Sequence, residues 1–422
     1  MSLFMSVIGM VVLLGLALLL SDNRKAINIR TVGGAFAIQF ILGGFILFVP
    51  AGQAVLNGMS IGIQSVIDYG NDGIRFLFGS LVDDSVQGIG FIFAFKVLPT
   101  VVFFSALISV LYYLGIMQFV IRILGGALRK VLGTSHAESM SATANIFVGQ
   151  TEAPLVVRPY VSKMTQSELF AVMCGGLASV AGGVMAGYAA MGVPLEYLIA
   201  ASFMAAPGGL LFAKIIKPET QEPVEQLKGD DEDEDKPANV IDAAASGASS
   251  GMQLALNIGA MLLAFIGLIA LINGMLSSVG GWFDLENLTL QWLLGKVFSP
   301  LAFLIGVPWA EADIAGSFIG QKLIVNEFMA YTDFVPYVGD SAKLVAETGQ
   351  IMTEKTQAII SFALCGFANL SSIAILLGGL GSIAPSRRHD IARFGVKAVC
   401  AGTLSNLMSA TIAGFFLSLS AL

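Results

Sequence analysis

The chain has 422 residues, of which 56% are hydrophobic and 12% are charged, and its mean hydropathy is +0.82. Ordinary soluble domains carry about 25% charged residues, so the composition excludes that class and predicts a polytopic membrane protein. The formal net charge of -7 comes largely from the run GDDEDED at 229–235, which indicates a solvated loop, so the charge itself says little about partners. We expect no nucleic-acid partner.

Eight stretches are apolar and about 20 residues long, the length that crosses a bilayer. They are 3–20, 32–50, 91–115, 168–193, 196–216, 252–276, 357–383 and 393–419. The first lacks a basic region and a small-residue cleavage site, so we interpret it as a spanning helix rather than a signal peptide. Residues 117–133 are apolar at helical spacing with basic residues on another face, which predicts an interfacial helix.

Two further apolar stretches, 139–161 and 311–334, are interrupted midway by polar residues. We predict that each is a re-entrant hairpin, which enters and leaves the membrane on one side. With the N-terminus outside, this arrangement places most of the 22 Lys and Arg residues inside, as the positive-inside rule requires. We therefore expect a multi-pass protein of the cell inner (plasma) membrane, with both termini on the periplasmic or extracellular side.

The chain also contains two similar blocks, each with a hairpin, an interrupted helix and a further helix. The interruptions are CGGLASVAGG at 174–183 and CGFANLSSIA at 365–374. Because the two hairpins open on opposite sides, the pattern indicates an inverted repeat with a site where the broken segments meet. We predict an all-α polytopic membrane protein with eight transmembrane helices, two re-entrant helical hairpins, interfacial helices and broken helices in an inverted repeat.

Two glutamates, Glu152 and Glu327, lie at the predicted hairpin tips. A carboxylate near the bilayer centre costs about 2.5 kcal/mol or more, which favours a functional role. The alternatives are an internal ion pair, with Arg158 and Lys322 as the nearest cations, or a helix-end residue that reaches the interface. No arginine pair or phosphate loop accompanies the acids, so the site favours a neutral or cationic solute, and carboxylates suit hydroxyl groups because they only accept hydrogen bonds.

Other polar residues near the interruptions are candidates for solute and ion binding. Gln150 and Thr151 offer donors and acceptors to an amide or a base edge. Phe367 is a candidate apolar face for a ring, although a lone Phe in a membrane helix more often contacts lipid or packs in the core. The candidate oxygen ligands for a small cation such as sodium are Asn145, Ser179 and the carbonyls of Val148 and Val180. The alternative for such Asn and Ser residues is ordinary interhelical hydrogen bonding. We expect no cofactor, because the three cysteines lie in apolar segments without a Cys/His cluster.

Three motifs resemble the signature stretches of the concentrative nucleoside transporter family in its short bacterial form. They are GQTEAP at 149–154, NEFMAY at 326–331 and GFANLSS at 366–372. The resemblance covers essentially the whole chain and implies a homotrimer in membrane lipid, with a scaffold and a mobile transport domain in each subunit. The scaffold would comprise 1–115 and 251–285. The transport domain would comprise 116–217 and 286–422, and 218–250 would be an acidic cytoplasmic loop.

The same resemblance implies roles for individual residues. Gln150 and Thr151 would read the nucleobase, with Glu152 acting through water. The ribose would be read by Glu327, Asn369 and Ser372. Phe367 would border the sugar or base, with Val184 packed on it. Sodium would be bound by Asn145, Ser179 and the carbonyls of Val148 and Val180. The long insert 338–357 departs from the family pattern.

The expected function is therefore a secondary active symporter, not an enzyme, that imports nucleosides such as uridine by alternating access. The inward sodium gradient would drive it. One alternative is a proton-coupled nucleoside symporter, with Glu152 or Glu327 as the proton carrier. A channel is disfavoured because two hairpins and two broken helices match an alternating-access site better. An intramembrane enzyme is disfavoured because no His accompanies a Ser or Cys and no metal-ligand spacing is present.

Overall fold

The computed structural model describes residues 2–82, 91–224, 237–282, 285, 288–339, 342–346 and 348–420. The acidic run at 229–235 lies outside these described residues. The first half contains the helices α1 (Ser2–Leu20), α2 (Ile29–Leu47), α3 (Pro50–Phe78), α4 (Phe93–Lys96), α5 (Leu98–Tyr113), α6 (Ile116–Leu132), α7 (His136–Ala144), α8 (Arg158–Val161), α9 (Gln166–Ala178), α10 (Gly182–Met191) and α11 (Leu195–Ile216).

The second half contains α12 (Val240–Gly280), α13 (Leu290–Leu304), α14 (Trp309–Ile324), α15 (Glu327–Phe334), α16 (Glu354–Leu364), α17 (Ser372–Ile383) and α18 (Arg388–Ser420). Within the insert 338–357, strands β1 (Leu344–Val345) and β2 (Gln350–Ile351) pair antiparallel, with Leu344 opposite Ile351. Short 3-10 turns complete the described part of the chain: η1 (Arg24–Ala26), η2 (Gly79–Val82), η3 (Ala153–Val157), η4 (Val335–Tyr337) and η5 (Pro385–Arg387).

The predicted spanning helices are largely confirmed. Within the described residues, 7 helical segments can cross a membrane by length and composition, and a bent pair, α13 with α14 at 116°, would make 8 if it crossed as one. The predicted span 357–383 is divided into α16 and α17 by an irregular segment, and 168–193 is divided into α9 and α10. Both predicted helix breaks are therefore present.

The structure differs from the sequence prediction in one additional helix and in one helix boundary. Helix α3 was not predicted, because polar residues recur along its 29 residues and lower its hydropathy below that of a spanning helix. Pro50 occupies its first turn, and Gly79, at a φ of 56°, ends it. Helix α12 begins at Val240, where the Asn239 side chain accepts a hydrogen bond from the Asp242 N–H. The predicted loop 218–250 therefore ends about ten residues early, because an N-cap starts the helix there.

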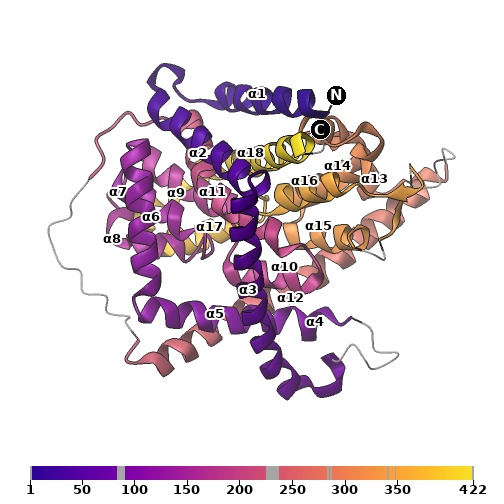
Figure 1. The fold of residues 1–422 in the computed structure, drawn as a ribbon, viewed down its shortest axis with the longest axis horizontal. Coiled ribbons are helices and arrows are strands. Elements are labelled where there is room, and N and C mark those ends of the chain that lie inside the picture. The colour runs from indigo at the N-terminus through magenta and orange to yellow at the C-terminus, as the bar shows by residue number, and fades with distance from the viewer. Residues whose placement is uncertain are drawn as a thin grey trace.

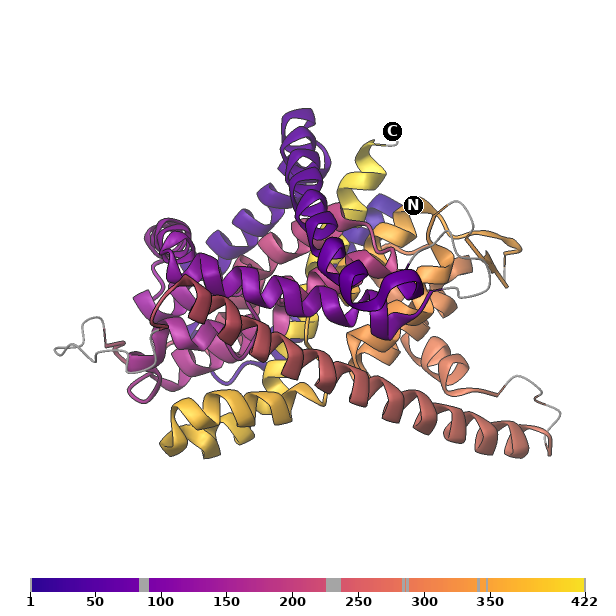
Figure 2. The same cartoon turned by 90° about the horizontal axis from the view of Figure 1, so that it is seen from below.

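The interior is formed by the helices around the two breaks. In the most apolar part of α9–α10 and of α11, 94% of the residues are buried, and in that of α18 83% are buried. In the corresponding parts of α4–α5 and α12, only 22% of the residues are buried. Helix α11 lies at the centre of the molecule (Figure 1), and the long α12 runs along one side (Figure 2). Helices α1 and α2 pack on α11 and α18, and α5 packs between α10 and α12.

Two helices approach α5 through glycine pairs. Gly247 and Gly251 of α12 lie so close to α5 that added Cβ atoms would stand 2.5 Å from Ser109 Cβ and 2.7 Å from Ser105 Cβ. Gly183 and Gly187 of α10 repeat this spacing of four residues on a neighbouring face, where added Cβ atoms would lie 3.2 Å from Val101 O and Val97 Cγ1. Such pairs allow close backbone approach between membrane helices.

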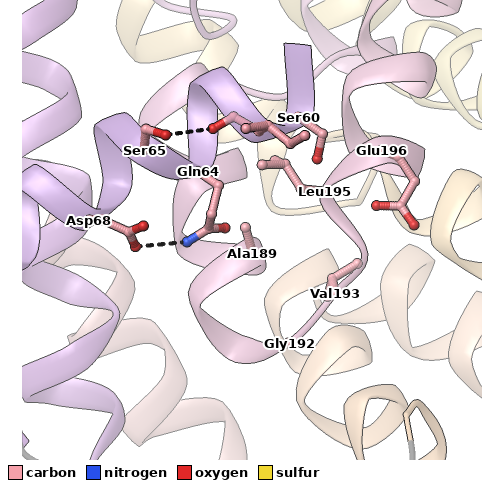
Figure 3. A pocket seen from close by; sticks show the side chains of 10 residues that line it. Ser60, Gln64, Ser65, Asp68, Ala189, Gly192, Val193, Leu195 and Glu196 are labelled. Atoms are coloured by element: carbon pink, nitrogen blue, oxygen red, sulfur yellow. Dashed lines mark hydrogen bonds between the residues drawn. The ribbon is translucent and has the colours of Figure 1, made fainter. Parts of the chain in front are cut away.

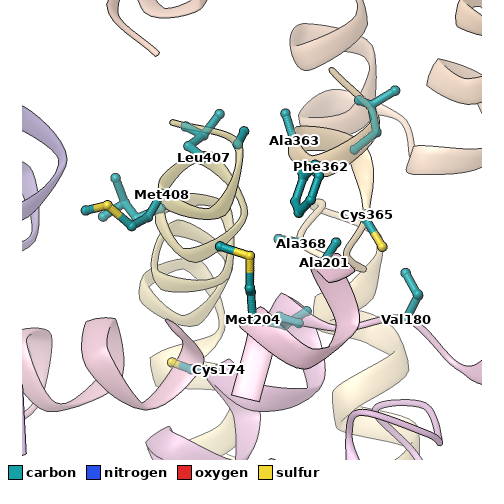
Figure 4. Close-up of a cluster of buried hydrophobic side chains, with 14 of the residues drawn as sticks. Cys174, Val180, Ala201, Met204, Phe362, Ala363, Cys365, Ala368, Leu407 and Met408 are labelled. Carbon is teal, nitrogen blue, oxygen red and sulfur yellow. The ribbon is translucent and has the colours of Figure 1, made fainter. Parts of the chain in front are cut away.

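An apolar cluster surrounds the helix breaks. Met204 of α11, Phe362 of α16 and Met408 of α18 lie together beside the segment that contains Cys365 (Figure 4). These side chains are at most 1% exposed. The irregular backbone at the breaks is thus enclosed in protein, which is where membrane proteins tolerate such backbone.

Candidate functional site

The first predicted hairpin, 139–161, is present as α7, an irregular tip at 145–152, η3 and α8. The tip packs on glycines of α9. A Cβ added at Gly175 would lie 3.0 Å from Asn145 Nδ2, and one at Gly176 would lie 2.8 Å from Gln150 Cβ. In addition, the Gly182 N–H donates to Phe147 O at 3.0 Å. The tip therefore sits directly against the break between α9 and α10.

The second predicted hairpin, 311–334, is present as α14 and α15 with a short tip between them. Asn326 starts α15, because its side chain accepts from the Met329 N–H at 2.8 Å. Glu327 is therefore the first residue of α15, where the positive end of the helix dipole favours a carboxylate. The hairpin contacts the second break, since the Leu370 N–H donates to Leu323 O at 3.2 Å.

Glu327 is the centre of a buried hydrogen-bonded group. Its side chain is 4% exposed. Oε1 accepts from Tyr188 Oη of α10 at 3.0 Å, and Oε2 accepts from Asn369 Nδ2 at 2.9 Å. The Asn369 amide oxygen in turn accepts from Ser371 Oγ at 2.7 Å and from the Ser372 N–H at 2.9 Å. Neutral donors from both halves of the chain thus hold this carboxylate in one orientation.

The two halves of the chain meet at this group. Gln150 Nε2, from the first tip, donates to Ser372 Oγ of the second half at 3.5 Å. The Phe367 N–H donates to Ser179 O at 3.1 Å and so joins the two breaks directly. Gln150, Asn369 and Ser372 are at most 4% exposed. Four of the predicted solute residues, Gln150, Glu327, Asn369 and Ser372, therefore belong to one enclosed polar group, and Phe367 borders it.

The other three predicted solute residues lie in different surroundings. Thr151 packs on α17, because a Cβ added at Gly379 would lie 2.8 Å from Thr151 Cγ2. Val184 is buried on α10, four residues before Tyr188. Glu152 is exposed, unlike Glu327. The two glutamates, both predicted at hairpin tips, therefore have opposite environments.

The predicted sodium ligands cluster at the end of α9. Asn145 is 1% exposed, and its Nδ2 donates to Ser141 O at 3.0 Å. Its Oδ1 is buried without a hydrogen-bond partner among the described residues. Ser179 ends α9, and its hydroxyl donates to Gly175 O at 3.0 Å. A buried amide oxygen left unpaired is unfavourable, so a small cation with oxygen ligands fits here. Val148 and Val180 are also buried.

Sequence reasoning missed two residues of this region, Tyr188 and Asn406. Lys322, a candidate ion-pair partner for a glutamate, donates from its Nζ to Asn406 Oδ1 and Ala363 O, both at 2.7 Å. Arg158, the other candidate cation, is exposed. Asn406 could have been identified from the sequence, because an amide inside an otherwise apolar span is costly without hydrogen-bond partners.

Two clefts lie outside the enclosed polar group. One, of about 500 Å³, is lined by Ser60, Gln64 and Asp68 of α3 and by Glu196 of α11, as Figure 3 shows. The other, of about 420 Å³, lies between α13, α14 and α15 and is lined by Lys296, Asp313 and Asp333, among others. Neither is lined by Gln150, Glu327 or Asn369.

Comparisons with known proteins agree with this architecture. A family profile described as Na+ dependent nucleoside transporter C-terminus matches residues 197–414, and the corresponding N-terminus profile matches residues 8–81. A third profile, described as Nucleoside recognition, matches residues 94–195. Together these profiles cover most of the chain.

Full-length relatives and a solved structure match as well. The chain is 65% identical to an uncharacterized transporter of Haemophilus influenzae, over 100% of this chain and 99% of that protein. It is 57% identical to the nucleoside permease NupC of Helicobacter pylori, over 99% and 98% of the two chains. The structure of CNTnw in an inward-facing substrate-bound state superposes with a TM-score of 0.94 at 60% identity, over 100% and 99% of the two chains. The chain therefore belongs to the concentrative nucleoside transporter family, and it is a multi-pass membrane transporter of nucleosides rather than an enzyme.

Proposed function

We propose that the protein is a secondary active symporter that imports nucleosides, uridine among them, with the inward sodium gradient as its driving force. The observation that carries this proposal is the enclosed group in which Glu327 and Asn369 are linked through Ser372 to Gln150 of the opposite half. It presents a carboxylate and two amides within one buried network. A nucleoside needs such a pairing of chemistries, because it has adjacent hydroxyls at one end and a base edge at the other.

The ribose would be bound by Glu327, Asn369 and Ser372. An ionised carboxylate accepts hydroxyl hydrogens at both oxygens, and each hydrogen bond to a charged group contributes about 1.5–3 kcal/mol. Phe367 and Val184 would provide the apolar faces beside the ring. The base would be read by Gln150, whose Oε1 is buried without a partner among the described residues, and by Thr151. Glu152 is exposed and would act through water.

Sodium would be held by Asn145, Ser179 and the carbonyls of Val148 and Val180. These are neutral oxygens, and the unpaired Asn145 Oδ1 supports an ion at this place. The same end of α9 carries Gly175 and Gly176, which contact Asn145 and Gln150 respectively. An ion that fixes this tip would therefore also fix Gln150, so sodium and nucleoside would favour each other's binding by the same factor.

Transport would proceed by alternating access, because the polar group is enclosed and a solute can reach it only if helices move. We propose that residues 1–115 and 251–285, with α1–α5 and most of α12, form the scaffold, and that residues 116–217 and 286–422 form the transport domain that moves. Helices α1 and α2 pack on α11 and α18, and α5 packs on α10, so these contacts would lie between the scaffold and the transport domain. The exposed face of α12 would contact lipid or the other subunits of a homotrimer in the inner membrane, with both termini outside.

The decisive experiment is binding of a nucleoside panel to the purified protein, titrated with sodium and with choline at equal ionic strength and fixed pH. We expect uridine to bind more tightly as sodium rises. If the affinity for uridine does not depend on the sodium concentration but rises as the pH falls, the protein would instead be the proton-coupled symporter. Failure of every nucleoside to bind would refute the substrate assignment. Uphill accumulation of uridine in vesicles would exclude a channel.

A further inference from the structure

A buried lysine lies beside the second break, and neither the proposed nucleoside site nor the proposed sodium site uses it. Lys322 is in the last turn of α14, five residues before Glu327, and is 3% exposed. Its Nζ donates to Ala363 O and to Asn406 Oδ1, both at 2.7 Å. Both partners are neutral oxygens. A buried ammonium is costly in a membrane protein and is therefore a functional hypothesis by default.

The ammonium lies at the broken end of a helix. Ala363 is in the last turn of α16, and Cys365 is the C-cap of that helix. The last carbonyls of a helix lack partners within the helix and carry the negative end of its dipole. Lys322 thus supplies a positive charge where α16 is interrupted.

Asn406 extends this contact to the other break. Its Nδ2 donates to Cys365 O at 2.9 Å and to Ala178 O at 2.6 Å, while its Oδ1 accepts from Lys322. Ala178 is the last residue of α9 and precedes Ser179. A Cβ added at Gly366 would lie 2.3 Å from Asn406 Oδ1, so glycine is needed for this approach. One amide therefore connects the lysine to the ends of both interrupted helices.

The break that follows Ala363 carries the ribose candidates Asn369 and Ser372 and also contacts the second hairpin. Next to the lysine, Leu323 O accepts from the Leu370 N–H at 3.2 Å. At the tip, Glu327 Oε2 accepts from Asn369 Nδ2 at 2.9 Å. The second hairpin thus contacts the break 365–371 directly at Leu370 and Asn369, and Lys322 reaches it through Asn406, which donates to Cys365 O.

We propose that Lys322 is a built-in cation, whose ammonium does for the second break what a bound sodium ion does for the first. It is a positioning residue. It holds residues 365–371 against α14 so that Asn369 and Glu327 are set for the ribose without an exchangeable ion. Through Asn406 it also fixes the carbonyl next to Ser179, at the end of α9. This inference rests on the proposed function, because it assumes that the second half reads the ribose.

The test uses the full-length purified protein and the substitution Lys322→Met, which keeps the side-chain length and removes the charge. The measurement is the Kd of uridine and of 2′,3′-dideoxyuridine at saturating sodium, with thermal stability as a check on folding. We expect uridine to bind at least about tenfold more weakly and dideoxyuridine to change less than about threefold, so that discrimination by the ribose hydroxyls is lost. The matched control is Lys296→Met, which removes an outer lysine paired with Asp313 and should leave both affinities unchanged.

A second readout separates charge from packing. Lys322→Ala leaves space for a small cation, so methylammonium should recover at least about threefold of the lost uridine affinity, whereas tetramethylammonium at equal ionic strength should not. Asn406→Leu keeps the lysine, removes the link and should also lose ribose discrimination. It serves as the test if the lysine variants do not fold. Retained discrimination in Lys322→Met or Asn406→Leu, or no methylammonium recovery in folded Lys322→Ala, overturns the proposal. A parent protein that binds no nucleoside would instead refute the proposed function.

Discussion

The two hairpin tips are built from similar side chains but differ in how completely those side chains are bonded. At the first tip, Asn145 Oδ1 and Gln150 Oε1 are buried without partners among the described residues, and Glu152 is exposed. At the second tip, both oxygens of Glu327 accept hydrogen bonds. The difference teaches that the acid of the second tip is fully bonded by side chains from both halves of the chain, whereas the first tip leaves atoms for a ligand or an ion to satisfy.

The largest expected effect comes from the buried glutamate. Glu327→Gln would place an amide NH₂ against Tyr188 Oη or Asn369 Nδ2 and would remove the charged acceptor for the ribose. With two charge-assisted bonds of about 1.5 kcal/mol or more each, we expect uridine to bind about 100-fold more weakly. Isothermal titration or a filter assay on the purified protein would measure this.

The exposed glutamate is the matched control for that experiment. Glu152→Gln makes the same chemical change at the other tip, and we expect the uridine Kd to change by less than about threefold. If Glu152→Gln weakened binding as much as Glu327→Gln, the two tips would be equivalent and the contrast drawn above would be wrong.

A smaller effect is expected from the tyrosine that holds Glu327. Tyr188→Phe removes one bond to the carboxylate and keeps the ring, so uridine affinity should fall by about tenfold. Tyr331→Phe is the control, because Tyr331 stacks on Tyr188 at 4.5 Å between ring centroids but gives its hydroxyl to Ser361 O. Equal losses in both variants would indicate general packing damage rather than control of Glu327.

The first tip should respond to sodium instead. Asn145→Ala removes an unpaired amide oxygen, and we expect the sodium concentration for half-maximal uptake to rise by about tenfold. The uridine Kd at saturating sodium should stay close to that of the parent. An unchanged sodium dependence would move the ion to another place.

The smallest effect on binding is expected at the far end of the first half. There Lys214 pairs with the buried Glu138 and donates to Ser167 Oγ at 2.8 Å. Lys214→Met leaves a buried carboxylate unpaired and should cost about 3 kcal/mol of stability, seen as a lower melting temperature, with sodium dependence unchanged. Lys217→Met, which breaks a more exposed pair with Asp22, should cost about 1 kcal/mol or less.

Much of this architecture could be predicted from the sequence, because apolar length and interruptions by small polar residues are local signals. The hairpins, the broken helices and the amphipathic α6 were predicted in this way. Helix α3 was not, since its polar positions resemble a loop when hydropathy alone is considered. The hydrogen bond between Tyr188 and Glu327 and the contacts of Asn406 could not be predicted from the sequence either. They join residues 139 and 228 positions apart, and such distances follow from packing rather than from pattern.

The glycine pairs beside α5 bear on the rate of the proposed movement. At Gly247 and Gly251 of α12 the backbones are so close that added Cβ atoms would overlap α5, whereas at Gly183 and Gly187 of α10 they would still lie 3.2 Å from the nearest atoms. The α10 contact is therefore the looser one, and its glycines provide no side-chain ridges of the kind that normally pack into the grooves of another helix. If α10 slides along α5 during transport, side-chain packing at this contact would present few energy barriers. The rate of the proposed movement would then be set by the breaking of polar contacts around the helix breaks.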